Sequence, residues 1–510
     1  MAYPDLTSEE KLGIKTLGEL IASGYRPVTV KEELRRNLIR KIRHGEPVFS
    51  GIWGYENTVI PDVERAILSM HNINFLGLRG QAKTRMARSM TGLLDEYVPV
   101  LEGSDLNEDP LRPLTKNSAA LLSEKGNDTP VGWLHRDERY TEKLATPDVS
   151  VADLIGDVDP IRAATLKLPY SDERVIHFGL IPRANRGIFV INELPDLQAR
   201  IQVALFNILQ EGDIQIRGFK FRLPLDIQFV FTANPEDYTN RGSIVTPLKD
   251  RIDSQIVTHY PLTIEMGKKI TGQEAKVKEG QQTVVNDLVR NLIEQIAFEA
   301  RNSEYVDKKS GVSARMTISA YENLLSAAER RSLQNGETES YARISDLYHT
   351  VPSICGKVEL VYEGEVEGPV IVAQNLIGKA IRSVFKSYFS DLEKSKKDLD
   401  PQAGKIIEWF GAGHQIAIPD NLTNPEYRAR LKAIDGLDEY VERYLPEATP
   451  EEQLLFMEFT LHAFAEFSKI GRRILDDGSD FRDLLDTMLP NPEDFDDDDE
   501  DYFENDRDKF

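Results

Sequence analysis

One ten-residue run constrains the fold of this chain more than any other feature of its sequence. Residues 75–84 read FLGLRGQAKT; they follow the apolar run Ile73–Leu76 and open a helical stretch. Glycines let backbone N–H groups curl around phosphate oxygens, and a helix that begins directly after the loop adds a favourable dipole. The run therefore predicts a phosphate-binding loop between a strand and a helix.

The loop supplies the candidate nucleotide contacts. Lys83 is expected to pair with the β- and γ-phosphates, and the Thr84 hydroxyl is expected to ligate Mg²⁺. Position 82 usually carries glycine but is alanine here, so the loop alone is a weak match, which its setting between strand and helix strengthens. The predicted nucleotide-binding residues are Gly77, Gly80, Gln81, Ala82, Lys83 and Thr84.

A second apolar run, Gly187–Ile191, ends in Asn192 and Glu193. In a P-loop sheet this strand end lies beside the phosphate loop, where an aspartate usually holds Mg²⁺ and a glutamate polarises the attacking water. Glu193 is therefore the candidate base, and Asn192 joins Thr84 as a candidate magnesium contact. Because Asn192 lacks the charge of aspartate, we expect weaker metal binding.

Further polar residues follow in the order that an ATP site needs. The strand candidate Ile227–Thr232 runs towards Asn234, which is expected to orient water and sense the γ-phosphate. Arg251, with Arg241 as its rival, is the candidate finger that reaches a neighbouring subunit's nucleotide. Arg315 begins a later helix and is expected to act from the lid side. The predicted catalytic set is Glu193, Asn234, Arg251 and Arg315.

Hydrophobic patterning predicts an α/β domain followed by helices. Short apolar strands alternate with helical stretches from Ile52 to about Val257, which is typical of a parallel sheet sandwiched by helices. The basic run Val28–Arg43 predicts an amphipathic helix, and residues 285–296 carry an apolar stripe at helical spacing. Thr449-Pro450-Glu451-Glu452 predicts the capped start of another helix, with Phe456, Phe459, Ala463, Phe467 and Ile470 on one face.

These patterns predict five parts. They are an N-terminal helical segment (1–45), a nucleotide-binding α/β domain (46–262), a helical lid (263–350), a mainly helical C-terminal domain (351–490) and an acidic disordered tail (491–510). The tail holds 11 acidic residues against Arg507 and Lys509, a charge of −9. It reads either as a solubilising end or as a docking strip for a basic partner.

Composition narrows the class of partner. The chain of 510 residues has a net charge of −23, which argues against nucleic acid or an anionic membrane as the main partner. No apolar run approaches the ~20 residues of a membrane span. The single cysteine, Cys355, fits a reducing cytoplasm, and the scattered histidines give no zinc-type cluster. A cytoplasmic protein is therefore expected.

Taken in order, these motifs resemble the AAA+ ATPases, and within them the MoxR and magnesium-chelatase I-subunit group. Residues 179–188 (GLIPRANRGI) resemble the run before the second nucleotide motif of magnesium-chelatase I subunits. Leu209–Pro224 resembles the pre-sensor hairpin of that group, and Gly51–Glu56 stands where the group has the loop that flanks the adenine. The resemblance covers roughly residues 45–345.

The resemblance implies a Mg²⁺-dependent ATPase, with ATP and Mg²⁺ as cofactors, that remodels a partner protein or assists metal insertion. It implies a helix-2 insert around Ile161–Pro182 and hexameric rings whose ATP sites are completed by Arg251. Such proteins often act on a partner with a von Willebrand A domain. The roles implied are Walker A for Lys83 and Thr84, Walker B for Asn192 and Glu193, sensor 1 for Asn234, finger for Arg251 and sensor 2 for Arg315.

Other interpretations stay open. Asn192 also suits a nucleotide-binding switch or scaffold that does not hydrolyse ATP. A magnesium-chelatase I subunit proper, which inserts magnesium into a porphyrin, is a further alternative. A DNA helicase is the weakest interpretation because the acidic chain shows no basic groove interleaved with aromatic residues. The polar segment Glu102–Pro147 is expected to be an insertion of the kind that is often functional.

Overall fold

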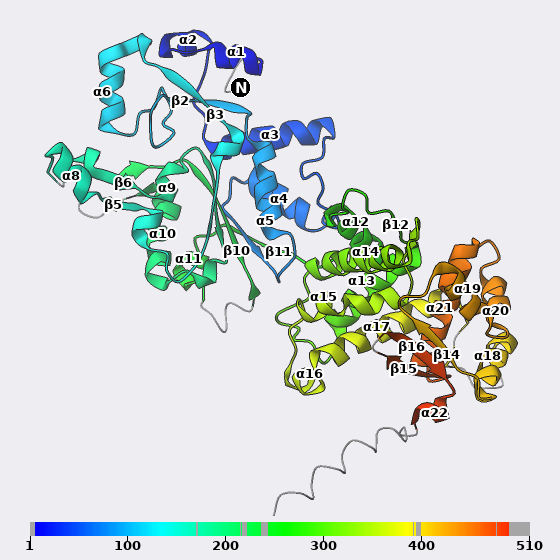
Figure 1. The fold of residues 1–510 in the computed structure, drawn as a ribbon. Coiled ribbons are helices and arrows are strands. Elements are labelled where there is room, and N and C mark those ends of the chain that lie inside the picture. The colour runs from blue at the N-terminus through cyan, green and yellow to red at the C-terminus, as the bar shows by residue number, and fades with distance from the viewer. Residues whose placement is uncertain are drawn as a thin grey trace, which may run out of the picture. The chain divides into compact units, whose positions relative to one another are not determined.

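The computed structural model describes residues 6–169, 172–214, 216, 222–235, 243–390, 392–393, 399–475 and 477–488. The chain divides into two compact units, Met1–Pro261 and Leu262–Phe510 (Figure 1). The predicted acidic tail (491–510), the rival finger Arg241 and residues 217–221 of the predicted hairpin lie outside the described residues.

A five-stranded parallel sheet forms the centre of the first unit, in the order β11-β1-β10-β7-β4. The strands are β1 (Ile73–Leu76), β4 (Tyr140–Leu144), β7 (Gly187–Asn192), β10 (Ile227–Ala233) and β11 (Ser254–Val257). The three strands predicted from apolar runs are β1, β7 and β10, and they are neighbours in the sheet. The loop after β1 therefore lies beside the carboxyl ends of the other two.

Helices cover both faces of this sheet, as predicted. Ile188 and Val190 of β7 pack into one core with α3 (Val30–His44), α4 (Val59–Leu68) and α5 (Lys83–Ser89). Phe189 and Ile191 pack into the other core with α9 (Leu180–Arg183), α10 (Ala199–Glu211) and α11 (Thr246–Lys249). Successive side chains of a strand point to opposite faces, so an uninterrupted apolar run buries both.

The segment Glu102–Pro147, predicted to be an insertion, contains a strand of the central sheet. Its strand β4 lies at the sheet edge and, among the described residues, pairs with β7 alone. The same segment holds α6 (Lys116–Lys125) and β3 (Val131–His135), which pairs antiparallel with β2 (Tyr97–Leu101). The prediction failed because β4 reads YTEKL and is only half-buried, as an edge strand can be, so it lacks the apolar run of a central strand.

Smaller elements surround the sheet. The N-terminal helices α1 (Ser8–Gly13) and α2 (Leu17–Ala22) precede α3, and α2 packs in a small core with β3. Where the helix-2 insert was expected, α7 (Val151–Leu154) leads into β5 (Gly156–Val158) and β6 (Ile176–Phe178), which pair antiparallel around α8 (Pro160–Leu166). The expected hairpin has its base in β8 (Asp213–Ile214) and β9 (Leu223–Pro224).

The second unit is mainly helical, as predicted, with one hydrophobic core. The core runs from Leu288 to Phe481 and crosses the expected boundary at residue 350. The helices are α12 (Ile264–Glu274), α13 (Asp287–Asn302), α14 (Arg315–Asn335), α15 (Val351–Cys355), α16 (Tyr362–Glu367), α17 (Pro369–Tyr388), α18 (Pro401–Gly411), α19 (Asn424–Lys432), α20 (Leu437–Tyr444), α21 (Pro450–Glu466) and α22 (Leu484–Met488). Within the described ranges, none of them is both long and apolar enough to cross a membrane.

Two features of the second unit differ from expectation. Thr449 caps α21 and forms a capping box with Glu452 as predicted, but every residue from Leu454 to Phe464 is buried, and Ile470 lies beyond the helix end. The single apolar face is therefore wrong: α21 runs through the core. An antiparallel sheet of β14 (Ile416–Pro419), β16 (Gly478–Arg482) and β15 (Gly471–Leu475) was not predicted, because these strands are only four or five residues long and β15 (GRRIL) and β16 (GSDFR) have neither an apolar run nor a regular alternation.

Candidate functional site

Polar side chains that follow β1, β7 and β10 meet at the carboxyl edge of the central sheet. The buried Lys83 Nζ donates to Asn234 Oδ1 (2.5 Å), to the Leu78 carbonyl (3.1 Å) and to the Gly77 carbonyl. Asn234 Nδ2 in turn donates to Glu193 Oε2 (2.7 Å). One amide side chain thus connects the lysine of the loop with the candidate base.

A second chain of hydrogen bonds runs beside the first. The Thr84 hydroxyl donates to Asn192 Oδ1 (3.1 Å), and the Thr232 hydroxyl donates to the same oxygen (3.2 Å). Thr232 Oγ1 also accepts the backbone N–H of Glu193 (3.1 Å). Two hydroxyl donors fix the orientation of the Asn192 amide, with its oxygen towards Thr84. The sequence brought Thr84 and Asn192 together, but Thr232 was not among the candidates.

The predicted phosphate loop is held from the other side by the end of β10 and by the residue that follows β11. Thr258 Oγ1 donates to Gln81 Oε1 (2.7 Å), and Gly77 N donates to the Ala233 carbonyl (3.1 Å). A Cβ at Gly77 would lie 2.0 Å from Thr258 Oγ1 and 2.2 Å from Gln81 Oε1, so a side chain there would displace the Thr258–Gln81 hydrogen bond. Thr258 was missed because β11 (SQIV) is a half-polar edge strand; a threonine directly after a strand was the signal that could have identified it.

The segment expected to flank the adenine does reach the loop. The Tyr55 hydroxyl contacts two backbone carbonyls, Gln81 O (2.9 Å) and His259 O (2.7 Å), and Thr58 Oγ1 lies 2.8 Å from His259 Nε2. Burial raises the pKa of the Tyr55 hydroxyl, so it stays a neutral donor. Tyr55 therefore connects residues 51–58 with the loop, through the Gln81 carbonyl, and with the chain after β11, through the His259 carbonyl.

Two non-glycine residues of the site have left-handed backbone conformations. Ala82 has φ 55° directly before α5, and Glu193 has φ 56° directly after β7. Such a conformation costs roughly 1–2 kcal/mol for a residue with a Cβ. At position 193 it turns the chain at the strand end, so that the carboxylate reaches Asn234. At position 82 it is the conformation that the usual glycine adopts freely.

The arginine candidates have different surroundings. Arg251, after α11, donates to Gln210 Oε1 (3.1 and 2.8 Å) and to the Pro247 carbonyl (2.7 Å), and its guanidinium lies 5.1 Å from the centre of the Phe206 ring. These contacts hold it against α10, and among the described residues it makes no hydrogen bond to the groups bonded around Lys83. Arg315 is exposed at the start of α14 in the second unit, so its predicted role at the phosphate stays a prediction.

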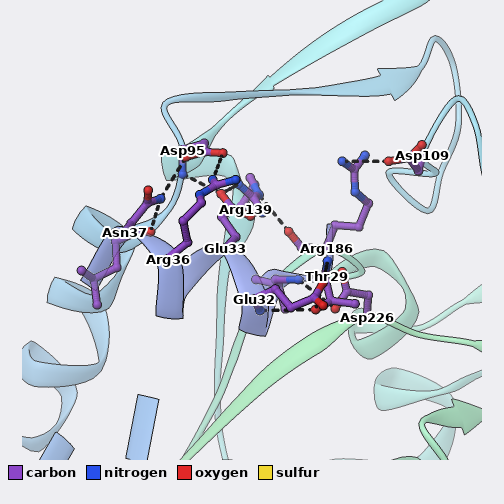
Figure 2. A network of polar contacts seen from close by, with 12 residues as sticks. Thr29, Glu32, Glu33, Arg36, Asn37, Asp95, Asp109, Arg139, Arg186 and Asp226 are labelled. Atoms are coloured by element: carbon purple, nitrogen blue, oxygen red, sulfur yellow. Dashed lines mark hydrogen bonds and ion pairs between the residues drawn. The ribbon is translucent and has the colours of Figure 1, made fainter. Parts of the chain in front are cut away.

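A different polar network lies at the amino edge of the same sheet (Figure 2). Arg139, directly before β4, donates to both oxygens of Glu33 of α3 (2.7 and 2.6 Å), and both side chains are buried. Arg139 Nε also donates to the Arg186 carbonyl (2.8 Å). The pair therefore fastens α3 to two strands of the sheet.

The run that resembles magnesium-chelatase I subunits contributes to this network rather than to the phosphate loop. Arg186, directly before β7, donates to the Pro99 carbonyl (2.5 Å) and pairs with Asp109 (3.3 Å). Asn185 Nδ2 donates to the Leu106 carbonyl (2.9 Å), and Asn185 Oδ1 accepts the Asp226 N–H (2.9 Å). These side chains join the segment 99–109 to the sheet.

Asp226, directly before β10, completes the network. Its two carboxylate oxygens accept the Val30 N–H at 3.0 and 2.9 Å, at the start of α3. Burial raises the pKa of this carboxyl to about 6, although the Val30 N–H and Arg186 act in the opposite direction. The amino edge is therefore a buried, charged junction between the sheet and α3.

The carboxyl edge offers oxygen donors for a metal rather than an acidic cage. In the parts of the chain that the structure describes, no group of three or more His, Cys, Asp or Glu side chains is placed to hold a metal ion. The available oxygens beside Lys83 are the Thr84 hydroxyl and the Asn192 carbonyl. Mg²⁺ in phosphate sites is held by carboxylates, or by a loop hydroxyl with an aspartate, together with phosphate oxygens and water. The Thr84 hydroxyl and the Asn192 amide oxygen supply oxygen donors of this kind but without the negative charge.

Comparisons with known proteins agree with this geometry. Residues 169–255 match the Sigma-54 interaction domain. The chain is 26% identical over 226 residues to the magnesium-chelatase 38 kDa subunit of Cereibacter sphaeroides, covering 42% of this chain and 60% of that subunit. It is 26% identical over 211 residues to the competence protein ComM of Haemophilus influenzae, covering 39% of this chain and 35% of ComM. The chain thus spans less than two thirds of either relative.

Among solved structures, the BchI–BchD complex of magnesium chelatase shares 18% identity over 62% of this chain and 98% of that chain, with a TM-score of 0.32. The strand order and the placement of the motifs, rather than this low global similarity, define the fold here. The chain is thus similar over part of its length to the magnesium-chelatase subunit and to ComM, and residues 169–255 carry the similarity to the Sigma-54 interaction domain. The MoxR branch expected from the sequence stays a prediction.

Proposed function

We propose that the chain is a Mg²⁺-dependent ATPase that works as a ring of identical subunits. The observation that carries this proposal is the continuous contact of Lys83, Asn234 and Glu193 beside the Thr84–Asn192 pair. These five side chains lie at or after the ends of three strands, and four of them are of the type that ATP hydrolysis uses at their place, whereas Asn192 replaces the usual aspartate. The relatives at 26% identity support the same class of machine.

The residues around the loop fit a triphosphate. Helix α5 begins at Lys83 without a side-chain cap, which suits phosphate oxygens as acceptors for its first N–H groups. Lys83 would exchange its bonds to the Gly77 and Leu78 carbonyls for phosphate oxygens. Thr84 and Asn192 would hold Mg²⁺, which when bound neutralises charge on the β- and γ-phosphates.

Glu193 would act as the base that accepts a proton from the attacking water. Asn234 holds its carboxylate through one N–H, at 2.7 Å, and places it beside Lys83. The left-handed backbone at Glu193 and the Thr232 bond to its N–H keep this carboxylate at the strand end. Asn234 is then the residue that couples the position of Glu193 to the lysine.

A second candidate function rests on Asn192. A neutral amide stands where an aspartate usually holds the metal, and its oxygen already accepts two hydroxyls. Such a site binds Mg²⁺ less tightly, so the chain could be a nucleotide-held switch or scaffold that does not turn over. Purified protein that binds ATP yet releases no phosphate, with or without partners, would favour this candidate over the ATPase.

The direct test is phosphate release by the full chain and by Glu193→Gln. We expect the variant to bind ATP as tightly as the wild type and to lose turnover by a factor of 10² or more, the usual contribution of a positioned base. Glu124→Gln, an exposed glutamate of α6, is the matched control and should leave turnover unchanged. Equal turnover in Glu193→Gln would remove Glu193 from the chemistry.

The ring and the finger are tested together by mixing variants. Arg251→Ala keeps Glu193, and Glu193→Gln keeps Arg251, so each alone should be inactive if Arg251 completes a neighbour's site. A mixture should recover part of the wild-type turnover, because some interfaces combine an intact base with an intact arginine. Absence of recovery in a mixture that still assembles would place Arg251 outside the site.

We infer remodelling of a partner protein or assistance in metal insertion, with a hexameric ring and a partner that carries a von Willebrand A domain. A role as a magnesium-chelatase I subunit proper is the alternative suggested by the 26% identity to the 38 kDa subunit. Magnesium insertion into a porphyrin, reconstituted with chelatase partner subunits, separates these two roles.

A further inference from the structure

Several apolar side chains are exposed close together in sequence on the second unit. Tyr362 and Val366 lie one turn apart on α16, and their side chains are 76% and 71% exposed. Gly364, on the other side of this helix, is buried against Tyr305. Val370 and Ile371, at the start of α17, extend the exposed surface. We name these four exposed side chains the α16–α17 surface.

The rim of the α16–α17 surface is acidic. Glu363, Glu365 and Glu367 are exposed between its apolar residues, and no Lys or Arg occurs from residue 358 to 378. Within the described residues, no cation pairs with any of these three carboxylates. Contiguous exposed apolar surface with a polar rim is typical of a protein interaction site. The charges indicate a partner that presents Lys and Arg.

The first unit carries a surface of the opposite charge. Arg40, Arg43 and the half-exposed Lys41 lie at the C-terminal end of α3 around Ile42, which is 47% exposed. No carboxylate of the described residues pairs with any of these three cations, in a chain with a net charge of −23. The opposite side of the helix is anchored in the core through Leu34 and Leu38. We name residues 40–43 the α3 surface.

We propose that the α3 surface of one copy docks on the α16–α17 surface of the next copy. The inference rests on the proposed ring and names two of the surfaces that build it. Three unpaired cations face three unpaired carboxylates, Ile42 meets the valines, and the long Arg and Lys stems cover apolar area. The exposed ring of Tyr362 also offers its face to a guanidinium.

Two different surfaces on the same chain make a head-to-tail contact. Such a contact repeats from copy to copy and closes into a ring when the rotation allows it. Because exposed charges are screened over about 8 Å at physiological ionic strength, this contact should weaken as salt rises. An anionic membrane or a nucleic acid would engage the α3 surface but would leave the α16–α17 surface without a role.

Charge reversal with exchange tests the proposal on the full chain. The first variant carries Arg40→Glu, Lys41→Glu and Arg43→Glu, and the second carries Glu363→Lys, Glu365→Lys and Glu367→Lys. Mass is measured by light scattering with a non-hydrolysable ATP analogue, and ATP binding and circular dichroism confirm that each variant is folded. Either variant alone should raise the concentration for half-assembly at least tenfold over the wild type.

An equimolar mixture of the two variants should assemble again. In an alternating ring, the acidic α3 surface of the first variant meets the basic α16–α17 surface of the second, and the two unchanged surfaces meet at the next interface. A single chain with all six substitutions should also assemble. Salt should weaken each of these assemblies, as it weakens the wild type.

Three outcomes overturn the proposal. Assembly of either single variant at wild-type concentrations would show that the surface is not part of the interface. Recovery by the six-fold variant without recovery by the mixture would place the contact within one chain. Folded variants that recover in neither arrangement would show that the surfaces are not partners. A wild type that never assembles would count against the proposed ring itself, whereas the first three outcomes leave the ATPase intact.

Discussion

The two edges of the central sheet are both polar, yet their side chains are arranged for different purposes. At the carboxyl edge, residues that follow strands meet around Lys83, and the bonds link neutral amides and hydroxyls with one cation and one carboxylate. At the amino edge, residues that precede strands form fully buried ion pairs such as Arg139–Glu33. In the proposed ATPase, the groups of the first arrangement exchange their partners for phosphate, whereas those of the second bind other parts of the chain.

The difference shows that a polar motif near a nucleotide loop need not contact the nucleotide. The run containing Asn185 and Arg186 looks like part of the nucleotide machinery because it directly precedes β7, which delivers Asn192 and Glu193. A parallel strand separates its two ends by its own length, so the residues before it lie at the opposite edge. Asn185 and Arg186 therefore stabilise the domain, and substitutions at the two edges should separate effects on stability from effects on ATP hydrolysis.

The largest effect is expected for Arg139→Leu. Removal of the guanidinium leaves Glu33 buried without its cation, and loss of one partner of a buried pair costs about 3–5 kcal/mol. The free energy of unfolding from urea denaturation checks this value. Arg88→Leu is the matched control, because the Arg88–Glu142 pair is exposed and should contribute less than about 1 kcal/mol. Equal losses of unfolding free energy in the two variants would mean that the buried Arg139–Glu33 pair contributes no more to stability than an exposed pair.

The second prediction concerns Asp226→Asn and pH. The folded pKa of Asp226 is raised from 3.8 to about 6, so the stability this group contributes is fully present below pH 3.8 and is lost as pH rises through 6. The asparagine variant has no such loss and can still accept the Val30 N–H. Its stability relative to the wild type should therefore increase by about 1.4 kcal/mol between pH 5.0 and pH 7.5.

Urea denaturation of both proteins at the two pH values measures this difference. A constant offset between wild type and Asp226→Asn would show that Asp226 does not titrate in this range. ATP binding by the variant at pH 7.5 should equal that of the wild type, because Asp226 lies at the amino edge. A large loss of nucleotide affinity in the folded variant would contradict the functional separation of the two edges.

A smaller effect, confined to metal binding, is expected for Asn192→Asp at the carboxyl edge. The new carboxylate faces the Thr84 hydroxyl and adds a charge beside the metal position, so the Mg²⁺ concentration for half-maximal turnover should fall about tenfold. Magnesium titration of ATP hydrolysis measures it. Asn185→Asp provides the control at the other edge: it loses the N–H bond to the Leu106 carbonyl, so it should lower stability and leave the magnesium requirement unchanged.

Much of this arrangement could be predicted from the sequence, for a physical reason. Strands buried on both faces leave uninterrupted apolar runs, so β1, β7 and β10 and the polar residues at their ends were identified. The edge strands β4 and β11 contain polar residues because they have one neighbour each, and they were missed. Because β11 was missed, Thr258, which directly follows it and binds Gln81 of the loop, was missed too.

Contacts between distant segments could not be predicted in the same way. Glu33 and Arg139 are far apart in sequence, and Glu33 reads as one more charge on an amphipathic helix until α3 is placed against the sheet. The one-face prediction for α21 failed for the same reason, because only tertiary packing decides that both sides of a helix are buried. Periodicity in the sequence predicts the helices and strands. Which polar groups end up in buried bonds is decided by the elements that pack against them.

The smallest expected effect separates strain from chemistry at the loop. Ala82 has φ 55°, so Ala82→Gly relieves a left-handed backbone conformation, while the greater freedom of glycine in the unfolded chain offsets part of that gain. We expect the variant to be more stable by about 0.5 kcal/mol, with ATP affinity unchanged within twofold. Gly45→Ala is the converse control, since Gly45 ends α3 at φ 67° with open space around its Cα, and alanine there should lose about 1 kcal/mol. Destabilisation by Ala82→Gly would mean that the alanine methyl contributes packing that outweighs its strain, and the departure from the usual glycine would then be a structural adaptation of this loop.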